Sequence, residues 1–429
     1  MNRYGARSGA EGPRVAVVRH DRFPGEPHLR RSVHALRDAG FVVDVICDHE
    51  PGKPRRENLE GVMVFRWLFQ HKRHGLLRYA FEYASIPFLA SLIVAARSLR
   101  KPYRYVEIDN PPDWLVLAGV IPRLQGAKVV LYMFENMPEL LAADRGTAMT
   151  HPAMRALVLV QRACARLANC LIAPHEMARR ILIEQGVPAG KIAAVVPNGP
   201  DPRVFLARVS REPDSYEVDE QHRTRLAIAG GDCNSPESGF RLVTHGTLLQ
   251  RYGIETLIEA VALLRDQLPG LHLDVIGEGE YRPQLEALTS RLGVNDYISF
   301  IDRVPFDQLA LYLLQADVGL VPVWAPFVPN KLMEYLMLGL PVITTDSAAV
   351  RHYFDDDAVC YVEAKDAVGL AEAILELYWN PDRRKKLAEV GHAVYRECYA
   401  WDRVKHQYIG VFDGTRENSG VSDAKMIEV

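Results

Sequence analysis

The sequence predicts an α/β protein made of two doubly wound, Rossmann-like parallel sheets. Apolar runs that are typical of buried strands alternate with amphipathic helical segments through both halves of the chain. A polar stretch, residues 206–239, interrupts this alternation and is rich in Arg, Asp, Glu, Ser and Gly. The chain has 429 residues, which is long enough for two domains, so we expect one sheet on each side of that stretch.

The first half begins with a strand–helix–strand unit. A strand over 14–19 precedes a helix over 28–38, which ends at Gly40, and a second strand over 41–47. The unit has the proportions of a Rossmann fold but lacks a Gly-x-Gly-x-x-Gly motif. Further strands are expected at 62–68, 105–108, 128–134, 170–173 and 192–196, and helices at 76–99, 114–124, 152–167 and 175–185.

The second half repeats the pattern. Strands are expected at 241–245, 271–276, 298–301, 318–321, 342–345 and 358–362, and helices at 254–267, 281–292, 307–315, 367–379 and 383–408. The expected organisation is a tail at 1–13, a first domain at 14–205, a linker at 206–239, a second domain at 240–400, a helix at 401–412 that packs back on the first domain, and a tail at 413–429. Ligands of such sheets bind beyond the carboxyl ends of the strands, so a cleft between the domains is the expected site.

The composition excludes several classes of function. A formal net charge of -3 gives no case for nucleic-acid binding, and 48% hydrophobic residues suit a globular protein. The six cysteines show no metal-binding spacing and favour a reducing, cytoplasmic compartment. The first residues do not resemble a signal peptide. We identify no Asp-x-Asp cluster of the type that holds a cation on a diphosphate, so no metal cofactor is expected.

A segment at 327–341 lies between two expected strands and begins a helix at Pro329. The free N–H groups of a helix start suit a phosphate. Lys331 and Glu334 are three residues apart and share one face of that helix. This pattern indicates a nucleotide site, with Lys331 for the phosphates and Glu334 for sugar hydroxyls. A Lys–Glu pair on the surface of an amphipathic helix has the same spacing, so both interpretations stay open.

Several segments, taken together, resemble the GT-B glycosyltransferases of family 4, which are retaining enzymes that use nucleotide-activated sugars. The resemblance spans roughly Arg14 to Phe412. In the second half it rests on residues 244–253, 271–279, 300–305, 329–335 and 339–342, and in the first half on residues 138–140 and 197–199 with Asp201 and Phe205. It implies two Rossmann-like domains facing across a cleft, with the acceptor bound by the first and the donor by the second.

The resemblance also implies roles for individual residues. The expected donor-binding residues are Gly246, Thr247, Arg251, Gly277, Val304, Phe327, Val328, Asn330, Lys331 and Glu334. The expected acceptor-binding residues are His20, Asp21, Asn110 and Glu135, and the expected catalytic residues are Glu135, Arg251 and Lys331. Each of two residues has an alternative role: Glu135 also suits the cap of a helix, and Arg251 also suits an arginine in a solvated loop.

The chain departs from the family at three points. Pro326 stands where many members carry a glutamate that touches the donor sugar, and Phe134 stands where many carry a histidine. Thr247 and Tyr252 replace the usual cations of the phosphate loop, and Arg251 is offset from both. Two alternatives therefore remain: a sugar-nucleotide epimerase on the same fold, or a member that binds nucleotide without catalysis.

The resemblance implies a UDP- or GDP-linked sugar as donor substrate, no separate cofactor, and a glycan, lipid-linked or small-molecule acceptor. An apolar helix around 84–96 is flanked by basic residues, including His71, Lys72, Arg73, Arg97 and Arg100. This pattern is typical of a helix on an anionic membrane surface, which would make the enzyme peripherally membrane-associated. It is also typical of a core helix with solvated basic ends, as found in buried helices of α/β proteins.

Overall fold

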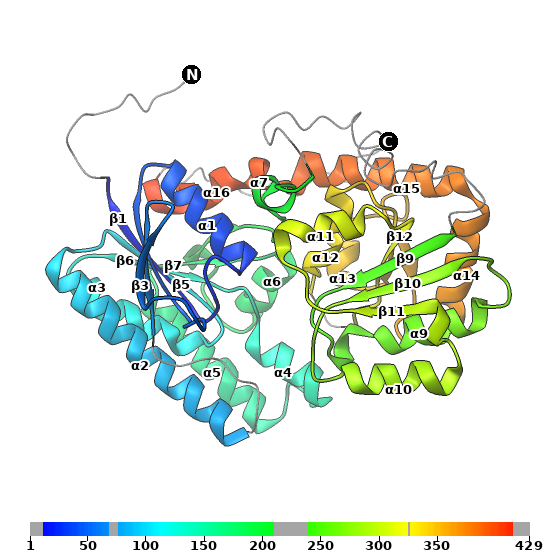
Figure 1. The fold of residues 1–429 in the computed structure, drawn as a ribbon. Helices are drawn as coiled ribbons and strands as arrows, with labels where there is room; N and C mark the ends of the chain where they lie inside the picture. Colours follow the sequence, from blue (N-terminus) through cyan, green and yellow to red (C-terminus); the bar gives the residue numbers. More distant parts are fainter. Residues whose placement is uncertain (1–11, 68–75, 210–238, 325–326, 415–429) are drawn as a thin grey trace. The chain divides into compact units, whose positions relative to one another are not determined.

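The computed structural model describes residues 12–67, 76–209, 239–324 and 327–414 (Figure 1). The chain divides into two compact units. The N-terminal unit contains the chain up to Pro138, Met149–Val196 and the chain from Lys405, and the C-terminal unit contains Glu139–Ala148 and Pro197–Val404. Most of the expected linker and tails, together with Pro326 and the basic residues at 71–73, lie outside the described residues.

The N-terminal unit is built on a sheet with the strand order β3-β4-β2-β1-β5-β6-β7-β8. All neighbouring strands are parallel except β3 and β4, which form an antiparallel pair at the edge. The strands are β1 (Arg14–Arg19), β2 (Val42–Cys47), β3 (Arg56–Leu59), β4 (Val62–Arg66), β5 (Tyr105–Asp109), β6 (Lys128–Tyr132), β7 (Cys170–Ala173) and β8 (Ile192–Val195).

Helices cover both faces of this sheet. They are α1 (Pro27–Asp38), α2 (Leu76–Arg100), η1 (Asp113–Gly119), α3 (Val120–Leu124), α5 (Pro152–Leu167), α6 (Glu176–Glu184) and η2 (Ala189–Lys191), and α4 (Met137–Arg145) crosses the division between the units. Buried side chains of α2, η1 and α5 share one apolar cluster with alternate residues of the strands, such as Val106 and Ile108. These three helices therefore cover the same face. No described helix is both long enough and apolar enough to cross a membrane.

The C-terminal unit is built on a fully parallel sheet with the order β11-β10-β9-β12-β13-β14. Its strands are β9 (Phe240–His245), β10 (Leu271–Ile276), β11 (Ile298–Ile301), β12 (Val318–Val321), β13 (Val342–Thr345) and β14 (Cys360–Val362). Its helices are α7 (Pro202–Phe205), η3 (Gln250–Tyr252), α9 (Ile254–Leu264), α10 (Arg282–Leu292), η4 (Asn295–Tyr297), α11 (Phe306–Leu313), α12 (Asn330–Met337), α13 (Ala348–Arg351), α14 (Ala367–Trp379), α15 (Pro381–Val394) and η5 (Tyr395–Tyr399), and α16 (Trp401–Asp413) begins in it.

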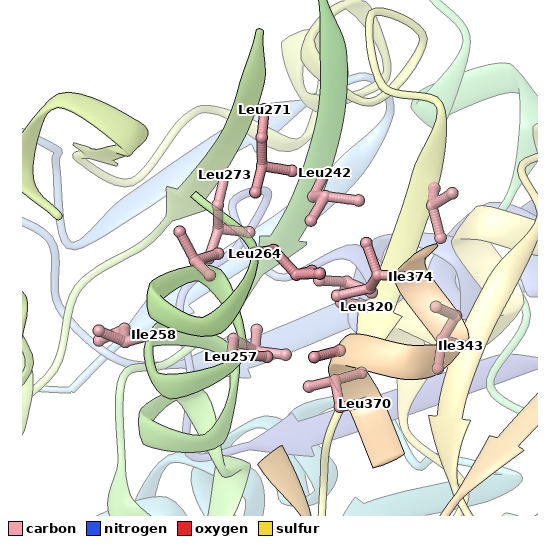
Figure 2. Packing of buried hydrophobic residues seen from close by; sticks show 14 of the residues in the cluster. Leu242, Leu257, Ile258, Leu264, Leu271, Leu273, Leu320, Ile343, Leu370 and Ile374 are labelled. Carbon is pink, nitrogen blue, oxygen red and sulfur yellow. The ribbon is translucent and has the colours of Figure 1, made fainter. Parts of the chain in front are cut away.

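The core of the C-terminal unit explains why a continuous sheet forms here. Figure 2 shows Leu257 of α9 and Leu370 of α14 packed beside strand residues such as Leu242 and Leu320. Alternate residues of the same strands, such as Val243 and Val321, face a second cluster under α11 and α12. Both faces of each strand are thus buried, which is why the strands appear in the sequence as continuous apolar runs.

Both sheets have a topological switch point. In the C-terminal unit the chain moves outward from β9 through β10 to β11, and then crosses back to β12 on the other side of β9. In the N-terminal unit the corresponding pair is β1 and β5. Loops that follow the two strands of such a pair diverge and leave a crevice for a ligand. The segments after β9 and β12, and those after β1 and β5, are therefore the first places to look for a site.

Two differences from the sequence-based expectation concern the strands and the division into units. Strand β3 was not expected, because its residues, Arg-Glu-Asn-Leu, are polar and stand at an exposed edge. The chain enters the C-terminal unit at Pro197 and not after Phe205, because Phe205 and Leu206 belong to that unit's apolar cluster. Cis peptide bonds precede Pro24, Pro111 and Pro112, in the loops after β1 and β5.

The C-terminal end of α16 completes the core of the N-terminal unit. Tyr408 and Phe412 are fully buried, and the Phe412 ring packs edge-on against Tyr105 and Phe41. The Tyr408 hydroxyl donates a 2.5 Å hydrogen bond to Glu107 in the middle of β5. Burial raises the pKa of Glu107 well above its usual range. Tyr408 and Glu107 are 301 residues apart in the sequence. This face of the sheet is therefore closed by a helix from the far end of the chain.

We expect Phe412→Ala to destabilise the protein by about 3–5 kcal/mol, because it leaves a cavity in a packed aromatic cluster. His406→Ala, at an exposed position of the same helix, should change the free energy of unfolding by less than about 0.5 kcal/mol. Urea unfolding followed by circular dichroism measures both. Equal effects of the two substitutions would contradict the packing role of α16.

Candidate functional site

The strongest candidate site lies at the switch point of the C-terminal unit, where Lys331 meets the loop after β9. Lys331 belongs to the first turn of α12, whose N-cap is Pro329. Its side chain is buried, and its Nζ lies 3.4 Å from the Thr244 hydroxyl oxygen. A Cβ placed on Gly246 would lie 3.8 Å from the same Nζ. Lys331 is therefore not the exposed member of a surface ion pair, and that interpretation of the Lys331–Glu334 spacing is wrong.

Burial lowers the pKa of the Lys331 ammonium to about 8, although the Glu334 carboxylate acts in the opposite direction. The face of the Tyr252 ring lies 5.2 Å from Nζ and supplies further weak stabilisation of the cation. The ammonium thus occupies a place where it has lost most of its water. Such a cation gains strongly from an incoming anion, because the anion replaces missing solvation.

Two glycines allow the loops after β9 and β10 to cross closely. Gly277 follows β10 and has φ 145°, and a Cβ there would lie 1.9 Å from the carbonyl oxygen of Gly246. A Cβ on Gly279 would lie 2.1 Å from the carbonyl oxygen of Leu248. Gly246 itself is exposed, with φ 122°. The strand ends therefore present bare backbone next to Lys331, which suits the close approach of a phosphate.

Arg251 lies in the short η3 turn that joins this loop to α9. Its guanidinium carbon lies 5.2 Å from the Tyr252 ring, the same ring that faces Lys331. The carbonyl oxygen of Arg251 accepts a 3.2 Å hydrogen bond from the Trp324 amide, which ties the loop after β9 to the loop after β12. The structure thus brings Arg251 and Lys331 to the same ring, that of Tyr252. Arg251 does so although it is offset in the sequence from the positions of the usual cations.

Glu334 is held by a residue that the sequence analysis did not single out. His245, the last residue of β9, places Nε2 2.5 Å from the Glu334 carboxylate and Nδ1 3.0 Å from the Tyr335 hydroxyl. All three side chains are buried. A neutral imidazole that donates from Nε2 and accepts at Nδ1 satisfies both contacts. The sequence feature that could have identified His245 is its position at the end of a strand, directly before Gly246.

The remaining residues expected to bind the donor lie around this cluster. Phe327 and Val328 are half-buried against the apolar cluster under α12, and the Phe327 ring is 6.4 Å from that of Tyr252. Asn330 is exposed at the start of α12, and Thr247 is half-buried beside Gly246. Val304 is half-buried in the loop after β11 and packs against the same apolar cluster. Their contacts with a donor stay predictions.

The N-terminal unit gathers its expected acceptor residues at the carboxyl ends of β1, β5 and β6. His20 follows β1 directly, and its Nδ1 lies 2.8 Å from the Asp48 carboxylate. The carbonyl oxygen of Asp21 accepts a 2.9 Å hydrogen bond from the Asp48 amide. Asp48 follows β2, so these contacts fasten the loop after β1 to the neighbouring strand end. An acceptor role for His20 and Asp21 stays a prediction.

Asn110 and Glu135 are in direct contact, but only Asn110 is buried. Asn110 is fully buried, and its amide nitrogen donates to the Glu135 carbonyl oxygen at 2.6 Å and to Asp113 at 2.8 Å. Its amide oxygen accepts from the Glu135 amide at 3.1 Å. Asn110 therefore positions the backbone that carries Glu135, whose residue is exposed. Burial raises the pKa of Asp113 to about 6, and the bond from Asn110 opposes this shift.

A charged cluster at the end of β1 was missed by the sequence analysis. Arg19 lies 3.4 Å from Glu26 and 3.5 Å from Asp109, and its guanidinium carbon lies 4.0 Å from the Phe134 ring. Burial raises the pKa of Asp109 to about 6, and Arg19 opposes this shift. Arg19 was interpreted as the end of a strand, because nothing in sequence separation links it to Glu26, Asp109 and Phe134. The Phe134 ring, which stands where many family members carry a histidine, thus stacks on a half-buried arginine.

The described residues contain no group of three or more His, Cys, Asp or Glu side chains arranged to hold a metal ion. One acidic run, Asp355 to Asp357, has the letters of an Asp-x-Asp motif. Asp356 pairs with Arg351 and Asp357 with Lys386. These carboxylates therefore serve local ion pairs on the surface of the C-terminal unit.

Two family models match the chain. Residues 25–199 match the family described as glycosyl transferase 4-like domain, and residues 239–380 match glycosyl transferases group 1. Together these segments cover well over half of the chain. With these matches and its two parallel-sheet units, the chain belongs to the GT-B glycosyltransferases of the family-4 type.

Individual relatives agree with this class. The chain is 28% identical over 185 residues to the lipopolysaccharide core biosynthesis glycosyltransferase LpsE of Rhizobium meliloti, covering 43% of this chain and about half, 53%, of that relative. It is 25% identical over 408 residues to the teichuronic acid biosynthesis glycosyltransferase TuaC of Bacillus subtilis, covering 90% of this chain and 94% of the relative.

Solved structures share the fold. Sucrose-phosphate synthase from Thermosynechococcus elongatus is similar with a TM-score of 0.71 at 18% identity, over 94% of this chain and 99% of that chain. HepE of Anabaena, in complex with UDP and glucose, is similar with a TM-score of 0.65 at 15% identity, over 93% and 99% of the two chains. At such identities the likeness concerns the fold alone.

We expect His245→Ala to weaken nucleotide binding selectively. The substitution removes the donor that holds the buried Glu334 carboxylate, which costs about 1–3 kcal/mol of stability. If Glu334 binds the sugar hydroxyls of the nucleotide, affinity for UDP or GDP should fall about tenfold, while affinity for inorganic pyrophosphate stays unchanged. Isothermal titration calorimetry measures both.

His272→Ala is the matched control, because His272 lies on the adjacent β10 and bonds to Ser299 away from the cluster. It should leave both affinities unchanged. His245→Gln should restore part of the nucleotide affinity, since its amide can donate to Glu334. An equal loss of pyrophosphate affinity in His245→Ala would contradict the assignment of Glu334 to the sugar.

Nucleotide affinity should also fall as the pH rises through about 8, the pKa of Lys331 in the protein without ligand. A bound diphosphate favours the ammonium and raises this pKa, so the complex holds a proton that the free protein loses. Affinity is therefore full below about pH 8 and decreases by up to about tenfold per pH unit above it. Lys331→Arg stays protonated and should show a flat profile. A flat profile in the unchanged protein would place Lys331 away from the phosphates.

Proposed function

We propose that this glycosyltransferase transfers a sugar from a nucleoside-diphosphate donor to an acceptor hydroxyl with retention of anomeric configuration. The observation that carries the proposal is the buried Lys331 ammonium beside the bare backbone of Gly246, at the switch point of the C-terminal unit. A desolvated cation next to exposed backbone is a poor arrangement in a resting protein. It becomes favourable when a diphosphate binds.

The same cluster supports a chemical role. Departure of a nucleoside diphosphate develops negative charge on the leaving oxygen. Lys331, Arg251 and the first turn of α12 would stabilise that charge, since preorganised donors in a site with little water act most strongly. Front-face attack by the acceptor hydroxyl gives retention, and Glu135, exposed and positioned by Asn110, would hold or deprotonate that hydroxyl.

The donor and acceptor classes follow from the relatives in general terms. HepE is described in complex with UDP and glucose, and LpsE and TuaC are named for lipopolysaccharide core and teichuronic acid biosynthesis. These names support a UDP- or GDP-linked hexose as donor and a glycan or lipid-linked glycan as acceptor. A cytoplasmic place for the reaction is supported by Cys47, Cys164 and Cys360, which are buried free thiols.

The test is transfer by variants of the donor site. Lys331→Ala should lower kcat/KM by about 100- to 1000-fold, the loss typical of a group that stabilises developing charge. Glu334→Ala should act mainly on the donor KM. The matched control is the exposed Lys385–Glu389 pair of α15, a helical Lys–Glu pair in the same unit whose alanine variants should keep full activity.

Unchanged transfer and nucleotide affinity in both site variants would overturn the proposal. The product's anomeric proton coupling, measured by NMR, decides the stereochemistry, and an inverted linkage would contradict retention. An isomerised donor sugar formed without acceptor would identify an epimerase, and tight nucleotide binding with no turnover across an acceptor panel would identify a binding-only protein.

A further inference from the structure

The N-terminal unit exposes an unusual set of apolar side chains. Sixteen large hydrophobic residues are exposed among the described residues, and ten of them lie on α2, on η1 with α3, and on α5. We call these ten residues the apolar patch. They are Phe88, Leu92, Leu99, Leu117, Val120, Ile121, Leu124, Leu159, Val160 and Leu167. In the C-terminal unit the exposed large hydrophobics are single residues on separate turns, such as Leu263 and Val368.

On each helix the exposed apolar residues follow the helical repeat. On α2 they are Phe88, Leu92 and Leu99, with exposed Ala96 completing an i, i+4, i+8, i+11 stripe. On η1 and α3 they are spaced i, i+3, i+4, i+7, and on α5 they are spaced i, i+1, i+8. These stripes point away from the core, and Leu124 is 80% exposed. An apolar outer stripe is opposite to the pattern of a surface helix in a soluble domain.

The stripes lie on one side of the unit. The inner faces of α2, η1 and α5 share a single buried cluster on one face of the sheet. Helix α2 packs against both η1 and α3, and α5 packs against η1. Figure 1 shows α2, α3 and α5 on the same side of this unit. Their outer faces therefore form one continuous surface. Contiguous exposed apolar surface of this kind marks an interaction site.

The charge of this surface has one sign. Among the described side chains, five exposed lysines and arginines lie on these helices or directly after them, whereas Asp113 of η1 is buried. They are Arg100, Lys101, Arg123, Arg155 and Arg166. Several adjoin the apolar stripes directly, as Arg100 follows Leu99 and Arg166 precedes Leu167. Apolar residues bordered by cations alone fit a partner that is apolar inside and anionic at its surface.

We propose that the apolar patch docks on an anionic lipid surface. Phe and Leu side chains would enter the boundary between head groups and acyl chains, and the adjoining arginines and lysines would contact the lipid phosphates. A second copy of the chain fits worse, since a symmetric dimer through this patch would bring these five cations close to the same five of the second copy. The proposal does not depend on the donor or acceptor of the proposed reaction.

The test is flotation of the full chain with vesicles, in the absence of substrates. Vesicles of phosphatidylcholine mixed with phosphatidylglycerol should carry the protein, and vesicles of phosphatidylcholine alone should not. Raising the salt concentration should release it. Leu124→Ser, Phe88→Ser and Leu159→Ser, one on each helix, should each lower vesicle affinity about tenfold. Arg100→Gln should lower it about fivefold, as expected for one cation near a lipid surface.

Val368→Ser is the matched control, because Val368 is 58% exposed on α14 of the C-terminal unit. It should leave vesicle binding unchanged. Circular dichroism and urea unfolding confirm that each variant is folded, and the three helices provide independent variants if one is not. Absence of binding to anionic vesicles, or equal binding to neutral ones, would overturn the proposal. So would a concentration-dependent dimer that Leu124→Ser dissociates without any vesicle binding.

Discussion

The burial of the Lys331 ammonium is the constraint on which the donor site depends. Removing a cation from water is costly, and the structure offsets the cost with the Thr244 hydroxyl, the Tyr252 ring and the nearby Glu334. Each of these partners in turn needs a fixed place. Thr244 belongs to β9, Tyr252 to the turn before α9, and Glu334 to the second turn of α12. The cation therefore links the two strands of the switch point through their following loops.

The neighbouring contacts show how this arrangement is kept rigid. His245 connects Glu334 to Tyr335, and Tyr335 is packed under Gly319 of β12, where a Cβ would lie 2.5 Å from the ring. Gly253 leaves room for the carbonyl oxygen of Pro322, 2.1 Å from where its Cβ would be. A larger residue at Gly253 would push the loop after β9 away from the loop after β12, and one at Gly319 would displace the Tyr335 ring. Close packing at these two glycines thus fixes the positions of the strands and loops that surround the buried Lys331.

Much of the fold could be predicted from the sequence, because both faces of the central strands are buried. Runs such as Val-Gly-Leu-Val in β12 are apolar without interruption, and they occur between helices of clear periodicity. Strand β3 escaped prediction because an exposed edge strand has no such run. Lys331 and Glu334 were found from helical spacing, but spacing could not show that they are buried. His245 and Arg19 were missed because their partners are distant in sequence, so only the folded chain brings them together.

The apolar patch lies away from the predicted acceptor residues. Helix α2 leads from the carboxyl end of β4 to the amino end of β5, and η1 starts directly after β5. The exposed apolar residues lie from the middle to the end of α2, of the η1–α3 segment and of α5. These helices run back from the carboxyl ends of the strands, so the patch lies towards the amino ends of the strands. Asn110 and Glu135 lie at the opposite edge, after β5 and β6. Lipid docking and the choice of acceptor are therefore independent properties, because the patch and the predicted acceptor residues lie at opposite ends of one sheet.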